Sequence, residues 1–170
     1  AHKTGVASYL RSSGRMLKSA MQDNIPVELQ IQVARDMLDD LLPEIRANIR
    51  LVAAEQVEVA NLEQEIERQR EAVREEATKL QTLRDTLREQ LVTYRIGGRE
   101  YARSELVEEL ARRFEHVKTA ELLLDGKEDL LKNRRRSLEA SLQKLEKTRL
   151  ERVRLASKIE QLEGQFHLLQ

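Results

Sequence analysis

Large aliphatic residues recur at every seventh position through the first half of this chain. The series is unbroken and consists of Ile31, Leu38, Ile45, Val52, Val59, Ile66, Val73, Leu80 and Leu87. A period of seven keeps one stripe of a helix facing a partner helix, which is typical of a coiled coil. The companion stripe alternates between leucine and polar residues such as Asn48 and Glu55, so the apolar face is narrow.

The second half repeats the seven-residue pattern. Its apolar positions are Leu110, Val117, Leu124, Leu131, Leu138, Leu145, Ile159 and Phe166. Arg152 interrupts the series. It could fix the register, mark where the second helix leaves its partner, or show that the heptad assignment is wrong there. The two periodic segments, Val27 to Thr93 and Ser104 to Gln170, have the same length and so predict an antiparallel pair of helices.

The segment between the periodic halves contains adjacent glycines, Gly97 and Gly98, flanked by β-forming residues. Glycine admits positive φ angles, so the segment predicts a β-hairpin with a two-residue turn. Ser104 is a good N-cap for the next helix. The expected fold is all-α: a long antiparallel coiled-coil hairpin with a short N-terminal amphipathic helix and a small β-hairpin at its tip. Its expected segments are 1–24, 25–93, 94–103 and 104–170.

Two residues inside the periodic segments disfavour a regular helix. Pro43 lacks a backbone donor and clashes with the preceding turn, which predicts a kink between Leu41 and Pro43. Gly126 weakens the second helix by about 1 kcal/mol relative to alanine. Because the Leu124 to Leu131 spacing stays in phase across it, we expect the second helix to continue through Gly126.

Composition narrows the class of protein. Only 3% of residues are aromatic and 35% are charged, which argues against a thick globular core. Basic and acidic residues balance at 30 each, so the whole chain is not built to attract nucleic acid. There is no cysteine, no apolar run long enough to span a bilayer, and no apolar core of a signal peptide at the start. These features predict a cytoplasmic protein.

The first 22 residues form a basic head without a single acidic residue. Apolar and basic residues separate onto two helical faces, which predicts a helix that lies in the headgroup region of an anionic membrane. The expected membrane-binding residues are Val6, Leu10, Arg11, Arg15, Leu17, Lys18 and Met21. The alternative is that this segment packs on the hairpin or on another subunit.

Residues for catalysis are scarce. The three histidines lie far apart, and adjacent acids such as Glu108 and Glu109 point about 100° apart on a helix. There is no phosphate-binding loop or zinc-protease motif. We therefore expect no enzyme activity, cofactor or metal. The basic run Arg134, Arg135 and Arg136 is assigned to contacts within the hairpin or between subunits, with phosphate binding as the alternative.

The junction of head and first helix has a recognisable order of features. It reads Ile25-Pro26-Val27-Glu28-Leu29, then Ala34-Arg35-Asp36-Met37-Leu38-Asp39-Asp40-Leu41 and Arg46. This order resembles the start of the phage shock protein A and vesicle-inducing protein in plastids family, a bacterial branch of the ESCRT-III superfamily. Ile25 and the Gly-Gly tip depart from the family pattern and indicate a divergent branch. The resemblance singles out Pro26, Met37 and Leu41.

The resemblance implies a homo-oligomer that polymerises, binds anionic lipids on the cytoplasmic face of the inner membrane, and remodels or protects the bilayer. A rival hypothesis is a soluble coiled-coil scaffold or adaptor that binds a protein partner through the tip. A third, a nucleic-acid-associated coiled coil, ranks last because no aromatic stacking residues accompany the arginine run. No nucleic-acid partner is expected.

Overall fold

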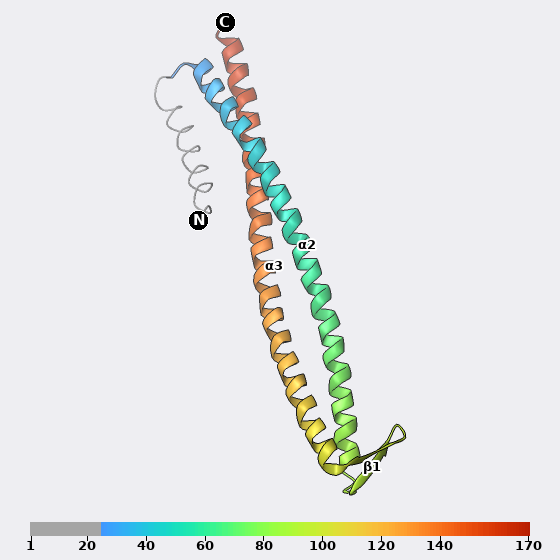
Figure 1. The fold of residues 1–170 in the computed structure, drawn as a ribbon. Coiled ribbons are helices and arrows are strands. Elements are labelled where there is room, and N and C mark those ends of the chain that lie inside the picture. The colour runs from blue at the N-terminus through green and yellow to red at the C-terminus, as the bar shows by residue number, and fades with distance from the viewer. Residues whose placement is uncertain (1–24) are drawn as a thin grey trace. The chain divides into compact units, whose positions relative to one another are not determined.

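Two long helices joined by a small sheet make up the fold. The computed structural model describes residues 25–170 and contains helix α2 (Val27–Leu87), strands β1 (Thr93–Ile96) and β2 (Arg99–Ala102), and helix α3 (Arg103–Leu168) (Figure 1). The two strands pair antiparallel. The predicted all-α hairpin with a small β-hairpin between its helices is confirmed. The predicted N-terminal amphipathic helix lies outside the described residues.

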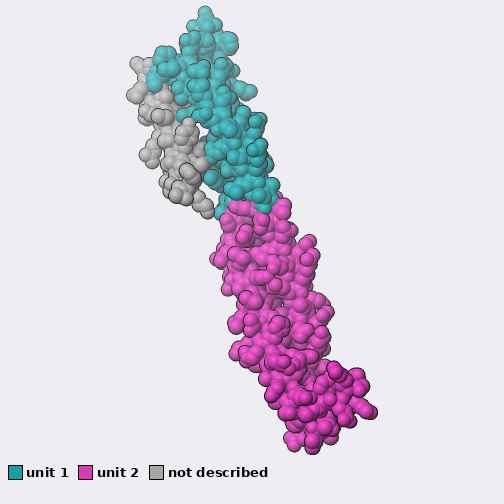
Figure 2. Space-filling model, in the orientation of Figure 1, with its two compact units in different colours: residues 1–54, 139–170 teal, residues 55–138 magenta. Residues whose placement is uncertain are grey.

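The chain divides into two compact units, and both long helices contribute to each of them. Among the described residues, unit 1 comprises 25–54 and 139–170, and unit 2 comprises 55–138 (Figure 2). Within each unit a stretch of α2 runs antiparallel to a stretch of α3 and buries a seam of aliphatic side chains between them.

The seam of unit 2 follows the seven-residue series of both helices. Val59 and Ile66 of α2 pack with Leu131 of α3, and partly buried leucines from both helices surround them. Burying an aliphatic side chain of this size stabilises the fold by about 1.5–3 kcal/mol. The narrow apolar face read from the sequence is therefore the core of this unit.

The seam of unit 1 bypasses Arg152, whose side chain is exposed. It runs instead through Thr148, which is 0% exposed, and through Leu155. The Thr148 hydroxyl donates to the backbone carbonyl of Lys144, so its burial leaves no donor unpaired. Ile159, further along α3, is buried again, so α3 does not leave its partner at Arg152.

The helix ends around the tip differ from those predicted. Helix α2 ends at Leu87, not Thr93, because Thr93 pairs with Ala102 in the sheet. Helix α3 begins at Arg103, so Ser104 lies inside its first turn and is not the cap. The Glu105 carboxylate accepts a hydrogen bond from the backbone N–H of Ala102 and supplies the capping contact.

The helix-weakening residues do not break either helix. Helix α2 continues through Pro43, whose exposed ring occupies a position where its missing N–H costs one internal hydrogen bond. The predicted kink there stays a prediction. Helix α3 runs through Gly126 without a break, as predicted. Across residues 25–170, neither helix contains a stretch long and apolar enough to cross a membrane.

Candidate functional site

The residues predicted to bind the membrane belong to the basic head. Val6, Leu10, Arg11, Arg15, Leu17, Lys18 and Met21 all lie outside the described residues. The candidate sites that the structure can place therefore come from the hairpin.

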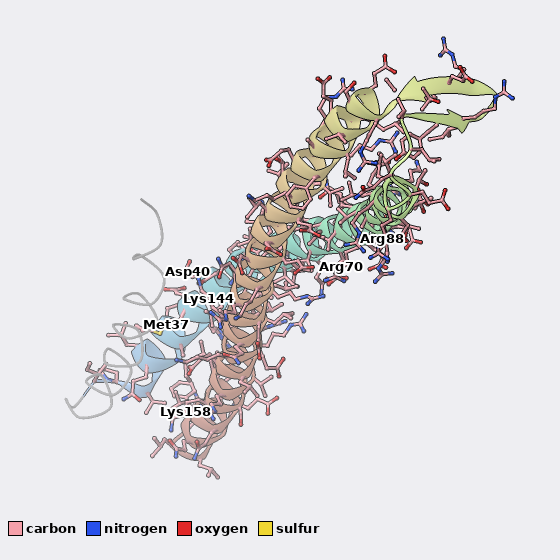
Figure 3. All side chains as sticks on the ribbon, turned by 90° about the horizontal axis from the view of Figure 1, so that it is seen from below. Met37, Asp40, Arg70, Arg88, Lys144 and Lys158 are labelled. Atoms are coloured by element: carbon pink, nitrogen blue, oxygen red, sulfur yellow. The ribbon has the colours of Figure 1, made fainter. Side chains whose placement is uncertain are left out.

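The three positions singled out by the family resemblance lie at the start of α2. Pro26 precedes the helix, and its carbonyl accepts hydrogen bonds from the N–H groups of Leu29 and Gln30 at 3.0 and 3.1 Å. Leu41 is buried in the seam of unit 1. Met37, which is labelled in Figure 3, is only partly buried. Of the two side chains on the helix, Met37 is thus the one with surface left for another molecule.

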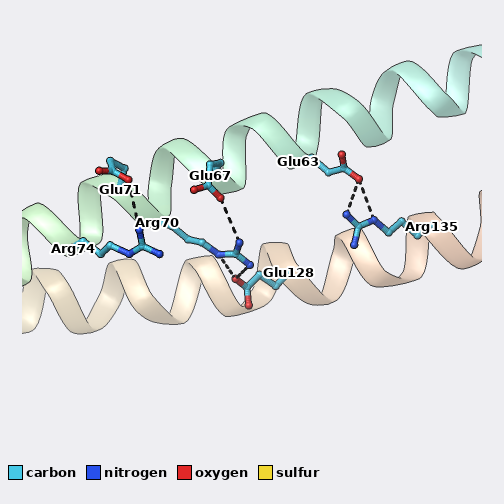
Figure 4. Close-up of polar contacts among 7 residues, drawn as sticks. All are labelled: Glu63, Glu67, Arg70, Glu71, Arg74, Glu128 and Arg135. Atoms are coloured by element: carbon cyan, nitrogen blue, oxygen red, sulfur yellow. Dashed lines mark hydrogen bonds and ion pairs between the residues drawn. The ribbon is translucent and has the colours of Figure 1, made fainter.

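The arginine run of α3 is used mainly within the hairpin. Arg135 donates two hydrogen bonds to one carboxylate oxygen of Glu63 on α2, at 2.7 and 3.0 Å (Figure 4). Arg134 lies 4.0 Å from the carboxylate of Glu58. Within residues 25–170, Arg136 has no ion pair and is exposed. The intramolecular alternative for this run therefore holds for two of its three arginines.

A second interhelical bridge lies one heptad away from the first. Arg70 of α2 contacts Glu128 of α3 and also lies 3.5 Å from Glu67 of its own helix (Figure 4). The hydrogen bond to Glu128 and the negative charge of Glu128 raise the pKa of Arg70 against the opposing effect of desolvation, and Glu67 adds a smaller increase. The guanidinium is therefore held in its charged form at this flank of unit 2.

The tip is built on the two glycines. Gly97 and Gly98 have φ angles of 60° and 79°, which a residue with a Cβ rarely adopts. Two consecutive positive φ angles are what a type I′ hairpin turn requires, and Tyr94 then pairs with Tyr101 across the sheet.

Tyr94 fastens the tip to both helices. Its ring is 4% exposed and packs with Leu87 of α2 and Leu106 of α3. Its hydroxyl donates to the backbone carbonyl of Glu89 and accepts hydrogen bonds from the N–H of Leu91 and from Arg103. The tip is therefore a packed element with satisfied polar groups.

A groove of about 730 Å³ lies beside the tip in unit 2. Three threonines one helical turn apart, Thr78, Thr82 and Thr86, line its α2 wall together with Lys79 and Leu83. Each donates its hydroxyl hydrogen to the backbone carbonyl four residues earlier. Ile96 and Tyr101 of the sheet also line the groove. The small side chains of α2 leave the space that forms this groove.

The α3 wall of the groove is charged. Glu109 receives hydrogen bonds from Arg113 at 2.8 Å and Arg112 at 2.5 Å. The hydrogen bond from Arg113, with the positive charges of both arginines, lowers the pKa of Glu109 against the opposing effect of desolvation. Glu108, which also lines the groove, has no ion pair within the described part of the chain.

Apolar side chains are exposed around the same tip. Val92 is 85% exposed and Ile96 is 40% exposed. Exposed apolar residues next to a groove are typical of surfaces that bind another molecule. Among residues 25–170, no group of three or more His, Cys, Asp or Glu side chains could hold a metal ion.

Sequence reasoning found the turn but missed the groove and the Tyr94 anchor. The threonines lie outside the heptad seam, so the seven-residue periodicity does not mark them. Their i, i+4 spacing was the available signal, because it places three small side chains on one face of a helix.

Comparison with known proteins adds no relative. No family model, curated protein or solved structure matches this chain.

Proposed function

We propose that this chain is a membrane-surface protein that self-assembles and remodels or protects an anionic bilayer. The observation that carries the proposal is the charge of the first 22 residues, which contain Lys3, Arg11, Arg15 and Lys18 and no acid. Each cation near an anionic surface contributes about 1 kcal/mol to binding. Because the total formal charge is zero, the remaining residues carry a formal charge of −4, with 26 basic and 30 acidic residues, so the basic excess is confined to the head.

The hairpin suits a role as an assembly unit. Its helices present long charged surfaces, while the seam is buried between them. Met37 is partly exposed and Arg136 has no ion pair within residues 25–170, so both are available for contacts between copies of the chain, whereas Leu41 supports the hairpin from inside. Self-assembly on a membrane would add the weak contributions of many heads, because linked binding events reinforce each other.

Vesicle co-sedimentation tests the membrane part of the proposal. The intact chain is compared with a variant carrying Lys3→Gln, Arg11→Gln, Arg15→Gln and Lys18→Gln, which keeps the apolar face of the head. We expect the intact chain to bind anionic vesicles and not zwitterionic ones, and to bind less at high salt. The variant should lose this binding.

The matched control removes four cations from the hairpin instead: Lys118→Gln, Lys132→Gln, Arg136→Gln and Lys147→Gln. This variant has the same net charge as the head variant and should keep most of the binding. Negative-stain images of the same samples should show polymers on the vesicles. Equal loss in both variants would contradict a specific role for the head, and the absence of polymers would contradict self-assembly.

A second candidate function is a soluble scaffold or adaptor that binds a protein partner through the tip. The groove beside Thr82 and the 85% exposure of Val92 favour it. Affinity capture with the intact chain is compared with Val92→Asp and with Leu169→Asp, which changes an equally apolar, 76% exposed residue outside the tip. A partner lost only with Val92→Asp would support this function, and a partner retained by all three chains would oppose it.

A further inference from the structure

Unit 1 contains a groove of its own between α2 and α3, with a volume of about 670 Å³. Its apolar lining comes from Ile45 and Ile49 of α2 and from Val153 and Ala156 of α3. Ile49 is 40% exposed and Val153 is 65% exposed. A ligand in this groove would therefore meet an apolar surface that water now covers.

Two arginines line the same groove. Arg149 and Arg152 are both exposed, and neither forms an ion pair with any residue of the described chain. Glu160 also lines the groove, but it lies about two helical turns beyond Arg152, roughly 12 Å along α3. One end of the groove therefore carries two guanidinium groups, and the acid stands at the other end.

The lack of a partner for Arg149 departs from the pairing found elsewhere in unit 1. Arg35 of α2 forms an ion pair with Glu163 of α3. Two heptads along both helices, the corresponding residues are Ile49 and Arg149. The position that would supply a carboxylate to Arg149 thus carries an isoleucine. Ile49 therefore adds apolar surface to the groove, and the guanidinium of Arg149 remains available to an anionic ligand.

The surrounding segment strengthens the positive potential. Residues 144–154 contain five basic residues and two acidic ones, a local charge of +3 (five minus two). Lys144, labelled in Figure 3, is an exposed residue of α3 in this segment and has no ion pair within residues 25–170. A ligand that is both anionic and apolar would match this surface best.

We propose that the groove of unit 1 binds an anionic phospholipid, with its phosphate diester held by Arg149 and Arg152 and its chain lying against Ile49 and Val153. Guanidinium groups donate paired hydrogen bonds that match the geometry of phosphate oxygens. The proposal rests on the proposed membrane function and gives the hairpin a second lipid contact, separate from the basic head.

A titration with a monomeric lipid tests the groove independently of the head. Dihexanoyl phosphatidylglycerol is added below its micelle concentration to the full chain with labelled Ile and Val methyl groups, and NMR shifts report both site and affinity. We expect shifts at Ile49 and Val153 and none at Ile66, which is buried in unit 2. Arg149→Gln with Arg152→Gln should weaken binding about 30-fold, the fold-change corresponding to about 1 kcal/mol for each cation.

Matched arms separate the alternatives. Lys144→Gln with Lys147→Gln removes the same charge outside the groove and should keep nearly all of the affinity. Dihexanoyl phosphatidylcholine, which has no net charge, and glycerol phosphate, which has no acyl chain, should both bind weakly. Equal binding of glycerol phosphate would overturn the assignment to a lipid. Unchanged affinity in the double arginine variant, or shifts confined to residues outside the groove, would overturn the site.

The titration and the vesicle assay fail in different ways. The head variant with four glutamines should titrate like the intact chain even where its vesicle binding is lost. A groove that binds no lipid, beside intact vesicle binding, would overturn this inference and leave the proposed function in place. Vesicle binding that does not depend on the head would count against the proposed function alone.

Discussion

Arg70 on α2 donates two hydrogen bonds to one carboxylate oxygen of Glu128 on α3, through Nε at 2.8 Å and Nη2 at 2.6 Å. One heptad away the charges are reversed, with Glu63 on α2 and Arg135 on α3. A slip of one heptad would place Glu63 opposite Glu128 or, in the other direction, Arg70 opposite Arg135. Each slip would thus bring one like-charge pair together, so the two bridges favour the present register of unit 2.

Reversing one charge should weaken unit 2, and reversing both should restore it. Arg70→Glu places two carboxylates together and should lower the thermal midpoint, while adding Glu128→Arg should recover most of the loss. Both effects should shrink at high salt because the pair is exposed. Circular dichroism melts of the four combinations measure the coupling. Purely additive changes would show that the bridge does not contribute.

Glu109 should stabilise the fold only above acidic pH. Its pKa is lowered below the ordinary value of 4.5, so its folded form holds a proton less readily than the unfolded form. The stabilisation is complete above the unfolded-state pKa and is lost as pH falls through the lower folded-state pKa. The difference in thermal midpoint between the natural chain and Glu109→Gln should therefore be constant near neutral pH and vanish in acid.

Glu108→Gln is the matched control for that experiment, because Glu108 has no ion pair within residues 25–170. It should show little pH-dependent difference. A pH profile for Glu109→Gln that matches this control would mean that the contacts with Arg112 and Arg113 do not stabilise the charged carboxylate.

Removing one hydroxyl should loosen the tip. Tyr94→Phe removes the hydrogen bonds that the hydroxyl makes with the Glu89 carbonyl, the Leu91 N–H and Arg103, and should destabilise the tip by about 1–3 kcal/mol. Hydrogen exchange of the β1 and β2 amides would measure the effect. Tyr101→Phe is the control, since the Tyr101 hydroxyl makes no hydrogen bond in the described structure. Equal exchange in both variants would rule out the proposed anchoring role.

The seam of unit 1 contains a polar side chain, and replacing it with an apolar residue should increase the stability of the fold. The side-chain nitrogen of Asn48 is buried and has no hydrogen-bond partner in the described chain. Asn48→Leu should raise the free energy of unfolding by about 1–2 kcal/mol, because it removes an unsatisfied donor and adds apolar contact. Chemical denaturation measures the change. Asn61→Leu, at an exposed position of α2, should have little effect; a loss of stability in Asn48→Leu would show that Asn48 is required there.

The heptads predicted the helices, the antiparallel pairing and most of the seam because all three depend on local periodicity. The end of α2 was harder, since Thr93 fits a helix until its pairing with Ala102 is known. Likewise, the role of Arg135 could not be settled before the register placed Glu63 opposite it. The tip groove depends on which small residues of α2 face α3, and only the folded arrangement shows this.

The threonine wall of the tip groove has a consequence for what the groove can recognise. The hydroxyl hydrogens of Thr78, Thr82 and Thr86 are donated to backbone carbonyls of α2. These residues therefore present methyl groups and oxygen lone pairs to a ligand. The three hydroxyls therefore leave no donor for a ligand, and on this wall the ammonium of Lys79 supplies one. The threonine face therefore selects a ligand by its shape. The charged α3 wall is expected to discriminate between ligands of similar shape.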